Sequence, residues 1–440
     1  MTVTFRTLAG ASLVVALMGT ASAQTTITVA TVNNGDMIRM QRLTPEFNAL
    51  HPDIKVNWVT LEENVLRQRV TTDIASRGGQ YDVLTIGNYE VPIWAKQGWL
   101  MPLENLGADY DQADLLPQVA QGLTVDGKLH AVPFYAESSM LMYRTDLLEK
   151  AGLKMPENPD WDFIAEAAQK MTDKGAGIYG ICLRGKAGWG ENMAFLTSMN
   201  NSMGGRWFDM EWKPQFNAPE WKKTLDTYLN LMKEYGPPGA SSNGFNENLA
   251  LFQTGKCGMW IDATVAASFI SDPKESQVAD KVGFAPAPVR KGGSNHGNWL
   301  WSWNLAIPAT TSKAEAAKTF VAWATSPAYT KLVAEKDGIA NVPPGTRTSL
   351  YKNPDYLKVA PFAEMTLTAI ESADTQKPSD LEVPYTGGQF VAIPEFQAIG
   401  TSVGQQFSAA LAGKATADQA LAAAQALTTR EMTRAGYPKK

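Results

Sequence analysis

The sequence predicts an α/β protein built as two domains, and three observations support this prediction. The chain has 440 residues, which is long enough for two domains with large cores. Through roughly the first hundred residues, β-branched segments alternate with helix-like segments, a pattern typical of a mostly parallel sheet covered by helices. From Asp146 to about Val282 a second, helix-rich unit follows.

The elements of the first unit follow from apolar periodicity and from the turn residues between segments. Strands are expected at Thr26–Thr31, Ile54–Val59 and Tyr81–Ile86, and helices at Met37–Leu50, Glu62–Arg77 and Val91–Gln97. In such sheets, ligands bind outside the carboxyl ends of strands, where the loops 33–36 and 87–90 lie. Asn34 and Asn88 are therefore candidate binding residues, although Asn and Gly are also ordinary turn formers. Of the two, Asn88 is favoured.

The stretch 128–150 places one carboxylate inside an apolar run. Val132–Tyr135 and Met140–Tyr143 are extended and apolar, and Glu137 lies between them. A buried charge is costly unless something pairs with it. Glu137 therefore needs a partner, which is either a polar ligand in a cleft or an Arg or Lys of an ordinary core.

The remaining elements are assigned by the same rules. Helices are expected at Thr145–Ala151, Trp161–Lys174, Glu191–Met203, Glu220–Tyr235, Asn246–Thr254, Lys313–Thr325, Tyr356–Ser372, Glu395–Ala412 and Thr416–Ala435. Strands are expected at Tyr179–Leu183, Lys256–Ile261 and Trp299–Ile307, with an extended segment at Gly283–Arg290. The last helix begins with a capping box.

Residues 1–23 predict an export leader. Arg6 precedes the apolar run Leu8–Gly19, which is too short to span a bilayer, and Ala21–Ala23 form an A-x-A cleavage signal. The mature chain is expected to begin at Gln24 as a soluble periplasmic protein. The net charge of −5 and the absence of a Lys/Arg run argue against nucleic acid as a partner.

The cysteines and histidines give no sign of a metal or cofactor. The three histidines are scattered, and the sequence contains no C-x-x-C. Cys182 and Cys257 lie in β-like segments, where export permits a disulfide and a buried free thiol fits equally well. We favour free, buried thiols, because the sequence gives no geometry.

Two segments match motifs associated with catalysis or phosphate binding, but the elements around them do not fit those roles. Gly175–Gly180 fits G-x-G-x-x-G, but it follows a helix and precedes a strand, the reverse of a phosphate-binding turn. Gly400–Gly404 fits G-x-S-x-G, but no β-branched strand precedes it and no histidine follows it. A hydrolase with paired carboxylates stays open, because the sequence cannot measure their separation.

Aromatic residues interleaved with amides and charges mark a candidate binding site. Aromatic faces pack against the C–H face of a sugar or polyol, while carboxylates and amides pair with hydroxyls. Trp189 lies in a loop with Arg184, and Trp260 and Asp262 end a strand.

A third aromatic group lies on one expected strand. The segment 298–304 places Trp299, Trp301 and Trp303 on the same face. We favour the core for Trp301 and Trp303. We favour the site for Trp299, which lies beside Asn298 at the mouth of the strand.

The stretch around Glu137 resembles the signature of the family 1 extracellular solute-binding proteins, the cluster that includes maltose-binding proteins. The matching residues are Tyr135, Glu137, Tyr143, Asp146 and 151–153. Most of the chain is consistent with that family. The resemblance implies a type II periplasmic-binding-protein fold, with two α/β lobes around a cleft and three crossings between them. Each lobe would hold a mostly parallel sheet flanked by helices.

The resemblance also divides the chain and implies a function. One lobe would contain residues 24–135 and 288–342, and the other residues 136–287 and 343–440. The protein would be a monomeric periplasmic component of an ABC importer that binds a sugar alcohol or related sugar, delivers it to the membrane permease and catalyses no reaction. A mono- or oligosaccharide ligand and a secreted carbohydrate hydrolase are the alternatives.

Single residues gain roles from the same resemblance. Glu137 matches an acidic sugar contact, Trp260 and Asp262 match a strand end that faces the cleft, and Phe396 falls near an aromatic platform that is Trp in the family. The Trp189 loop and the tryptophan strand resemble the sorbitol/mannitol-binding branch most. The candidate ligand-binding set is Asn34, Asn88, Tyr135, Glu137, Arg184, Trp189, Trp260, Asp262, Asn298, Trp299 and Phe396.

Overall fold

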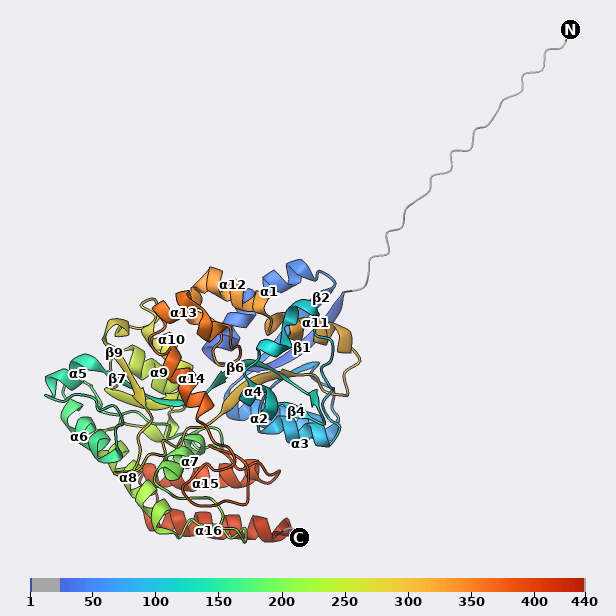
Figure 1. The fold of residues 1–440 in the computed structure, drawn as a ribbon. Helices are drawn as coiled ribbons and strands as arrows, with labels where there is room; N and C mark the ends of the chain where they lie inside the picture. The colour runs from blue at the N-terminus through green and yellow to red at the C-terminus, as the bar shows by residue number, and fades with distance from the viewer. Residues whose placement is uncertain (2–23, 439–440) are drawn as a thin grey trace.

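The computed structural model describes Met1 and residues 24–438, and the chain folds into two lobes (Figure 1). The predicted leader lies outside the described residues apart from Met1. In the figure, the first lobe combines the N-terminal third of the chain with segments after residue 300, and the second combines the middle of the chain with its C-terminal helices.

The first lobe is built on a five-stranded sheet in the order β2-β1-β3-β10-β6. Its strands are β1 (Thr25–Val32), β2 (Ile54–Leu61), β3 (Val83–Gly87), β6 (Val132–Glu137) and β10 (Trp301–Ala306). β1 pairs in parallel with β2 and β3, and β10, which enters late in the chain, runs antiparallel to both β3 and β6, so four of the five strands point the same way. The expected mostly parallel sheet is therefore found in this lobe.

Helices cover this sheet, and a short hairpin extends the lobe. The hairpin strands are β4 (Thr124–Val125) and β5 (Lys128–Leu129). The helices are α1 (Gly35–Leu50), α2 (Glu63–Ser76), α3 (Glu90–Lys96), α4 (Pro117–Gly122), α11 (Ala314–Ala324), α12 (Pro327–Asp337) and α13 (Pro354–Val359). α12 was not expected, although Ser326 caps it and Pro327 occupies its first turn.

The second lobe holds a three-stranded sheet in the order β8-β7-β9. Its strands are β7 (Ser139–Arg144), β8 (Met259–Ala263) and β9 (Val282–Pro286). Both pairings are antiparallel, so the expectation of a mostly parallel sheet is wrong in this lobe. The parallel partner of β8 is the segment 179–182, which forms only isolated bridges instead of the expected strand.

Nine helices surround the second sheet in the described part of the chain. They are α5 (Thr145–Lys150), α6 (Trp161–Met171), α7 (Asn192–Ser202), α8 (Pro219–Tyr235), α9 (Phe245–Gln253), α10 (Ala266–Ser271), α14 (Ala363–Glu371), α15 (Phe396–Leu411) and α16 (Ala417–Arg434). The single helix expected at 356–372 is divided into α13 and α14, because Pro361 lies between them and cannot continue a helix.

The crossings between the lobes connect the two sheets directly. The chain leaves the first sheet at Glu137 and enters the second at Ser139, and it returns between Pro286 and Trp301. Residues 344–346 still bond to the first lobe, because the carbonyl of Pro344 accepts from Ala136 N. We therefore propose that the third crossing begins after these residues, later than the predicted boundary at 342–343.

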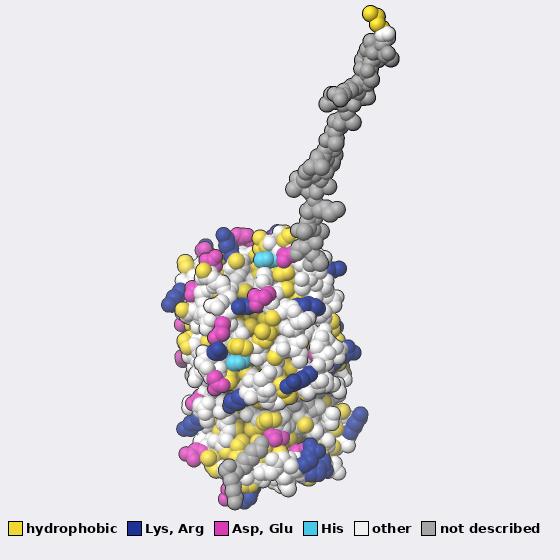
Figure 2. All heavy atoms as spheres, turned by 90° about the vertical axis from the view of Figure 1, so that its right-hand side faces the viewer, with side chains coloured by type: hydrophobic (Ala, Val, Ile, Leu, Met, Phe, Trp, Pro, Cys, Tyr) yellow, Lys and Arg dark blue, Asp and Glu magenta, His cyan; other side chains and the backbone are white. Residues whose placement is uncertain are grey.

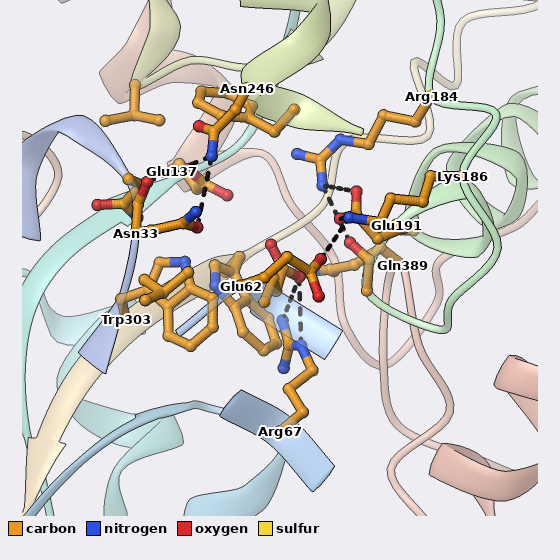
Figure 3. Close-up of a pocket in the computed structure, with 18 of the residues that line it drawn as sticks. Asn33, Glu62, Arg67, Glu137, Arg184, Lys186, Glu191, Asn246, Trp303 and Gln389 are labelled. Atoms are coloured by element: carbon orange, nitrogen blue, oxygen red, sulfur yellow. Dashed lines mark hydrogen bonds and ion pairs between the residues drawn. The ribbon is translucent and has the colours of Figure 1, made fainter. Parts of the chain in front are cut away.

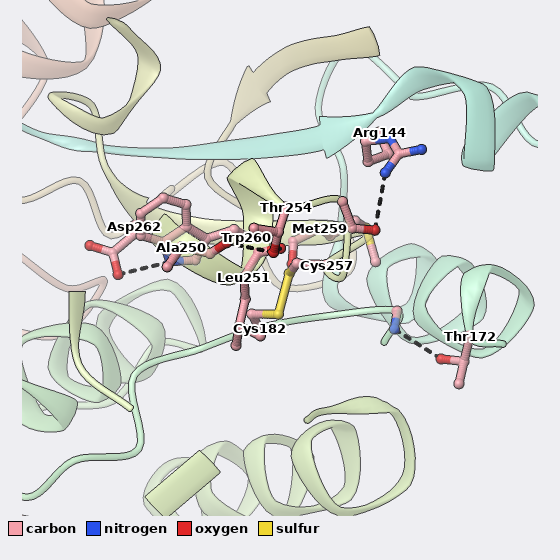
Figure 4. Close-up of a disulfide and its surroundings, with 12 residues drawn as sticks. Arg144, Thr172, Cys182, Ala250, Leu251, Thr254, Cys257, Met259, Trp260 and Asp262 are labelled. Atoms are coloured by element: carbon pink, nitrogen blue, oxygen red, sulfur yellow. Dashed lines mark hydrogen bonds between the residues drawn. A yellow bond between two sulfur atoms is a disulfide. The ribbon is translucent and has the colours of Figure 1, made fainter. Parts of the chain in front are cut away.

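Cys182 and Cys257 form a disulfide (Figure 4), so the expectation of free thiols is wrong. Their Cα atoms are 6.0 Å apart, although 75 residues separate them in sequence. Two parallel backbone bridges, Tyr179–Cys257 and Cys182–Trp260, hold the two segments side by side. This long-range register brings the thiols together, and no local sequence pattern encodes it.

The molecular surface carries charges of both signs. On the face shown in Figure 2, basic and acidic side chains are interspersed over both lobes. This mixture matches the mild net charge of the sequence. Among the described residues, no helix is both long enough and apolar enough to cross a membrane.

Candidate functional site

A cavity lies between the two lobes (Figure 3), and its volume is about 760 Å³ when the space open to solvent is included. Six of the eleven candidate residues line it: Asn34, Tyr135, Glu137, Arg184, Trp189 and Trp299. The other five do not line it: Asn88, Trp260, Asp262, Asn298 and Phe396.

One wall of the cavity is made of indole rings. Trp299, Trp301 and Trp303 all line it. Trp301 and Trp303 are also buried members of the hydrophobic core, as predicted. Trp301 and Trp303 lie on the same face of β10, with their ring centroids 5.4 Å apart, and Trp299 lies two residues before the strand begins. Gly87 makes room for this wall, since a Cβ atom there would lie 1.9 Å from the Trp301 ring.

The Arg67 guanidinium, which itself lines the cavity, packs on three of the indole rings. Its central carbon lies 4.0 Å from the ring centroid of Trp189, 4.7 Å from that of Trp301 and 4.8 Å from that of Trp303. Arg67 also pairs with Glu63 at 2.8 Å and with buried Glu90 at 3.3 Å. Sequence analysis missed Arg67, because an arginine on an amphipathic helix usually faces solvent.

Glu137 enters the cavity from the end of β6 with only 6% of its surface exposed. No hydrogen bond or ion pair joins its side chain to another described residue. Burial raises the pKa of Glu137 well above its ordinary value, Arg184 lowers it in part, and Asp262 raises it further. The alternative of an internal pair with Arg or Lys is thus not found among the described residues, and a ligand contact at Glu137 stays a prediction.

Arg184 is held in the cavity wall by Asp262, which is fully buried. The Asp262 carboxylate accepts from Arg184 Nη2 at 2.7 Å and from Nε at 2.9 Å, and it also accepts from Trp260 Nε1 at 3.0 Å. A bidentate pair of this kind fixes the plane of the guanidinium. Asp262 and Trp260 therefore position Arg184 instead of lining the cavity.

The other three predicted residues also support the walls. Asn88 bonds to the backbone of β10 at Ser302 N and to the carbonyl of Leu300. Asn298 accepts from Ser139 and donates to Ser372, near the crossings. The ring of fully buried Phe396 lies 6.1 Å from that of Trp189 and also packs on Trp207 and Tyr89.

Polar contacts join the lobes across the mouth of the cavity. Lys186 of the second lobe pairs with Glu62 of the first at 2.5 Å. Asn246, at the start of α9, donates to the carbonyl of Asn33 at 3.2 Å. Figure 3 shows these two contacts on either side of the cavity. Sequence analysis did not select these residues, because their role depends on how the two lobes meet.

The cavity holds more acidic than basic side chains. The lining acids are Glu62, Glu63, Glu137, Glu191 and Glu247, and the lining bases are Arg67, Arg184 and Lys186. Burial raises the pKa of Glu191 to about 8, with a further contribution from Glu63, while Arg184 and Lys186 lower it in part. In the described chain, no group of three or more His, Cys, Asp or Glu side chains is placed to hold a metal ion.

Comparison with known families decides the classification. The sequence profile of the bacterial extracellular solute-binding proteins matches residues 34–331. The chain belongs to this family. The mannitol-binding protein of Pseudomonas aeruginosa is 59% identical to this solute-binding protein over 94% of each chain. The family resemblance predicted from the residues around Glu137 is thereby confirmed.

Solved structures are similar over almost the whole solute-binding protein. An ABC transporter solute-binding protein from Agrobacterium vitis S4 with bound D-mannitol is 73% identical, with a TM-score of 0.93, covering 94% of this chain and 100% of that one. One from Agrobacterium radiobacter K84 with ribitol is 27% identical, with a TM-score of 0.81, covering 93% and 99%.

Maltose-bound MalE3 of T. maritima, at 24% identity and a TM-score of 0.77 over 92% of this chain and 99% of that one, shares the fold. The two-lobe type II fold that the resemblance implied is confirmed.

Proposed function

We propose that this solute-binding protein is the periplasmic component of an ABC importer and that it captures a hexitol of the mannitol or sorbitol type. The observation that carries the proposal is one cavity in which an indole wall faces polar groups with unused hydrogen-bonding capacity. The bound D-mannitol in the 73% identical Agrobacterium vitis protein supports it.

The lining chemistry suits a neutral, hydroxyl-rich ligand. The C–H edges of a polyol pack on indole faces, and its hydroxyls pair with carboxylates, amides and guanidinium groups. Glu137 and Tyr135, both on β6 of the first lobe, and Arg184 of the second lobe offer such groups. The excess of acidic side chains disfavours an anionic ligand such as a sugar phosphate.

Capture works by stabilising the shut arrangement of the lobes. A ligand that touches both lobes only when they are closed shifts the population toward that state. The Lys186–Glu62 pair would form on closure and be lost on opening. No step makes or breaks a covalent bond. The leader at residues 1–23 would direct a monomeric protein to the periplasm, where it delivers the ligand to the permease.

A thermal-shift screen tests this function, because a ligand that binds only the folded state raises the melting temperature. D-Mannitol and D-sorbitol are expected to raise it most, by the equivalent of about 2.7 kcal/mol at a hundred times the dissociation constant. Stabilisation by maltose but not by hexitols would favour the oligosaccharide alternative. Release of free sugar from glycosides would favour the hydrolase.

A further inference from the structure

The connection between α14 and α15 reaches the cavity through Gln389, a residue that sequence analysis did not select. Gln389 is 3% exposed and lines the cavity. Its Nε2 donates to the carbonyl of Leu300 at 3.2 Å. Because that carbonyl can only accept, the amide nitrogen must face it, and the orientation of the side chain is fixed. Gln389 Oε1 is then left buried with no hydrogen-bond partner among the described residues.

The backbone around Gln389 is shaped for this placement. Gly387 has φ +142°, and a Cβ atom there would lie 1.9 Å from the carbonyl of Phe390. The carbonyl of Gly388 accepts from Asn201 at 2.8 Å. The segment 387–390 is thus anchored to α7 on one side and to the strand entry before β10 on the other.

Trp299 packs directly against the segment 387–390, and its side chain has a hydrogen-bond donor without a partner among the described residues. A Cβ atom on Gly388 would lie 3.3 Å from Trp299 Cα, so the two backbones are in contact. Trp299 is 2% exposed and lines the cavity, and its Nε1–H has no partner in the described chain. One unused donor and one unused acceptor therefore lie on adjoining segments of the cavity wall.

We propose that Trp299 Nε1–H and Gln389 Oε1 are specificity-determining contacts that read hydroxyl groups of the ligand. A hydroxyl both accepts and donates, so a polyol can satisfy each atom, whereas a methylene in the same place leaves it buried and unpaired. This inference rests on the proposed function and assigns Trp299 a hydrogen-bonding role in addition to its apolar face.

The first test removes each polar atom, together with the pyrrole part of the ring in the case of Trp299. Trp299→Phe keeps an aromatic ring and deletes the N–H, and Gln389→Met keeps the length of the side chain and deletes the amide. Each change is expected to weaken D-mannitol binding about fivefold or more, as measured by titration calorimetry.

Two variants outside the cavity serve as matched controls. Gln425 has the same bonding state as Gln389, since its Nε2 donates to the carbonyl of Pro214 and its Oε1 is buried without a partner in the described chain. Trp58 has an indole N–H bonded to Thr44 in the first lobe. Gln425→Met and Trp58→Phe are expected to leave D-mannitol affinity unchanged.

The outcomes separate this inference from the proposed function. If the wild-type protein binds D-mannitol and both cavity variants bind it equally well, the specificity role is wrong and the proposed function stands. If the variants lose affinity only in proportion to a fall in their own melting temperature, the two residues act structurally and the inference is again wrong. If the wild-type protein binds no polyol, the proposed function is wrong, and the inference that rests on it is wrong as well.

Discussion

An Asp262→Ala variant is expected to lose about 3 kcal/mol of unfolding free energy, because it removes the hydrogen-bonded partner of the buried Arg184 guanidinium and leaves only the longer ion pair with Glu191 at 3.5 Å. Asp262 is fully buried and accepts three hydrogen bonds from Arg184. Urea denaturation of the ligand-free protein measures the loss. Asp146→Ala is the matched control, since Asp146 makes a similar two-point contact with Arg144 but is 38% exposed. The control should lose about 1 kcal/mol or less.

The same variant tests how Asp262 affects the ligand. Asp262 does not line the cavity, but Arg184 does. We therefore expect D-mannitol affinity to fall in Asp262→Ala, and to fall no further when the change is made in an Arg184→Ala background. A second, independent loss of affinity in that background would mean that Asp262 contacts the ligand directly. A stability loss no larger than that of Asp146→Ala would contradict the supporting role.

A Glu137→Gln variant is expected to bind D-mannitol at least about tenfold more weakly, or about 1.4 kcal/mol, because the amide replaces one carboxyl oxygen with an NH₂ group that cannot accept a hydrogen bond from a ligand hydroxyl. The ligand-free variant should nevertheless be more stable than the wild type near neutral pH. Glu137 is buried without a hydrogen-bond partner in the described chain, so its ionised form is poorly solvated there. Titration calorimetry and thermal melts of the empty protein measure the two effects.

The difference in stability between Glu137→Gln and the wild type depends on pH, and the direction of this dependence follows from the pKa of Glu137. The pKa of Glu137 in the folded protein lies well above its ordinary value of 4.5. The folded protein therefore keeps a proton that the unfolded chain releases. The tighter binding of this proton adds to the free energy of unfolding. The contribution is fully present below pH 4.5 and is lost as the pH rises through the folded-state pKa. Glu137→Gln lacks this dependence, so its advantage should shrink toward about pH 4. If Glu137→Gln melts at a lower temperature than the wild type at neutral pH and binds D-mannitol with the same affinity, Glu137 is a core residue and not a ligand contact.

Much of the fold was predictable because its signals are local. The capping box at Thr416 and Gln419 is present at the start of α16, and β1 and β2 lie within two residues of their predicted ends. Two local signals were overlooked, the Ser326 cap of α12 and the helix break at Pro361, and the other failures involve contacts between distant segments. The disulfide depends on the register between 179–182 and 257–260, and the antiparallel second sheet depends on which strands meet after several helices.

The candidate site was predictable where residue type and strand position agree. Trp299 and Glu137 lie at strand ends that border the cleft, and both line the cavity. Asp262 has the right type and position, but Arg184, located 78 residues earlier, occupies its carboxylate. Gln389 was missed because it lies in an aperiodic connection, where only the packing against Trp299 reveals its place.

Titration calorimetry of the mature protein with D-mannitol tests the central claim most directly, since the claim is that the interlobe cavity holds a hexitol. We expect saturable binding of one ligand per chain with a negative heat-capacity change, as burial of a ligand against indole rings requires. The absence of saturable heat with D-mannitol, D-sorbitol and ribitol up to about 1 mM, for a protein that is folded by circular dichroism, would contradict it.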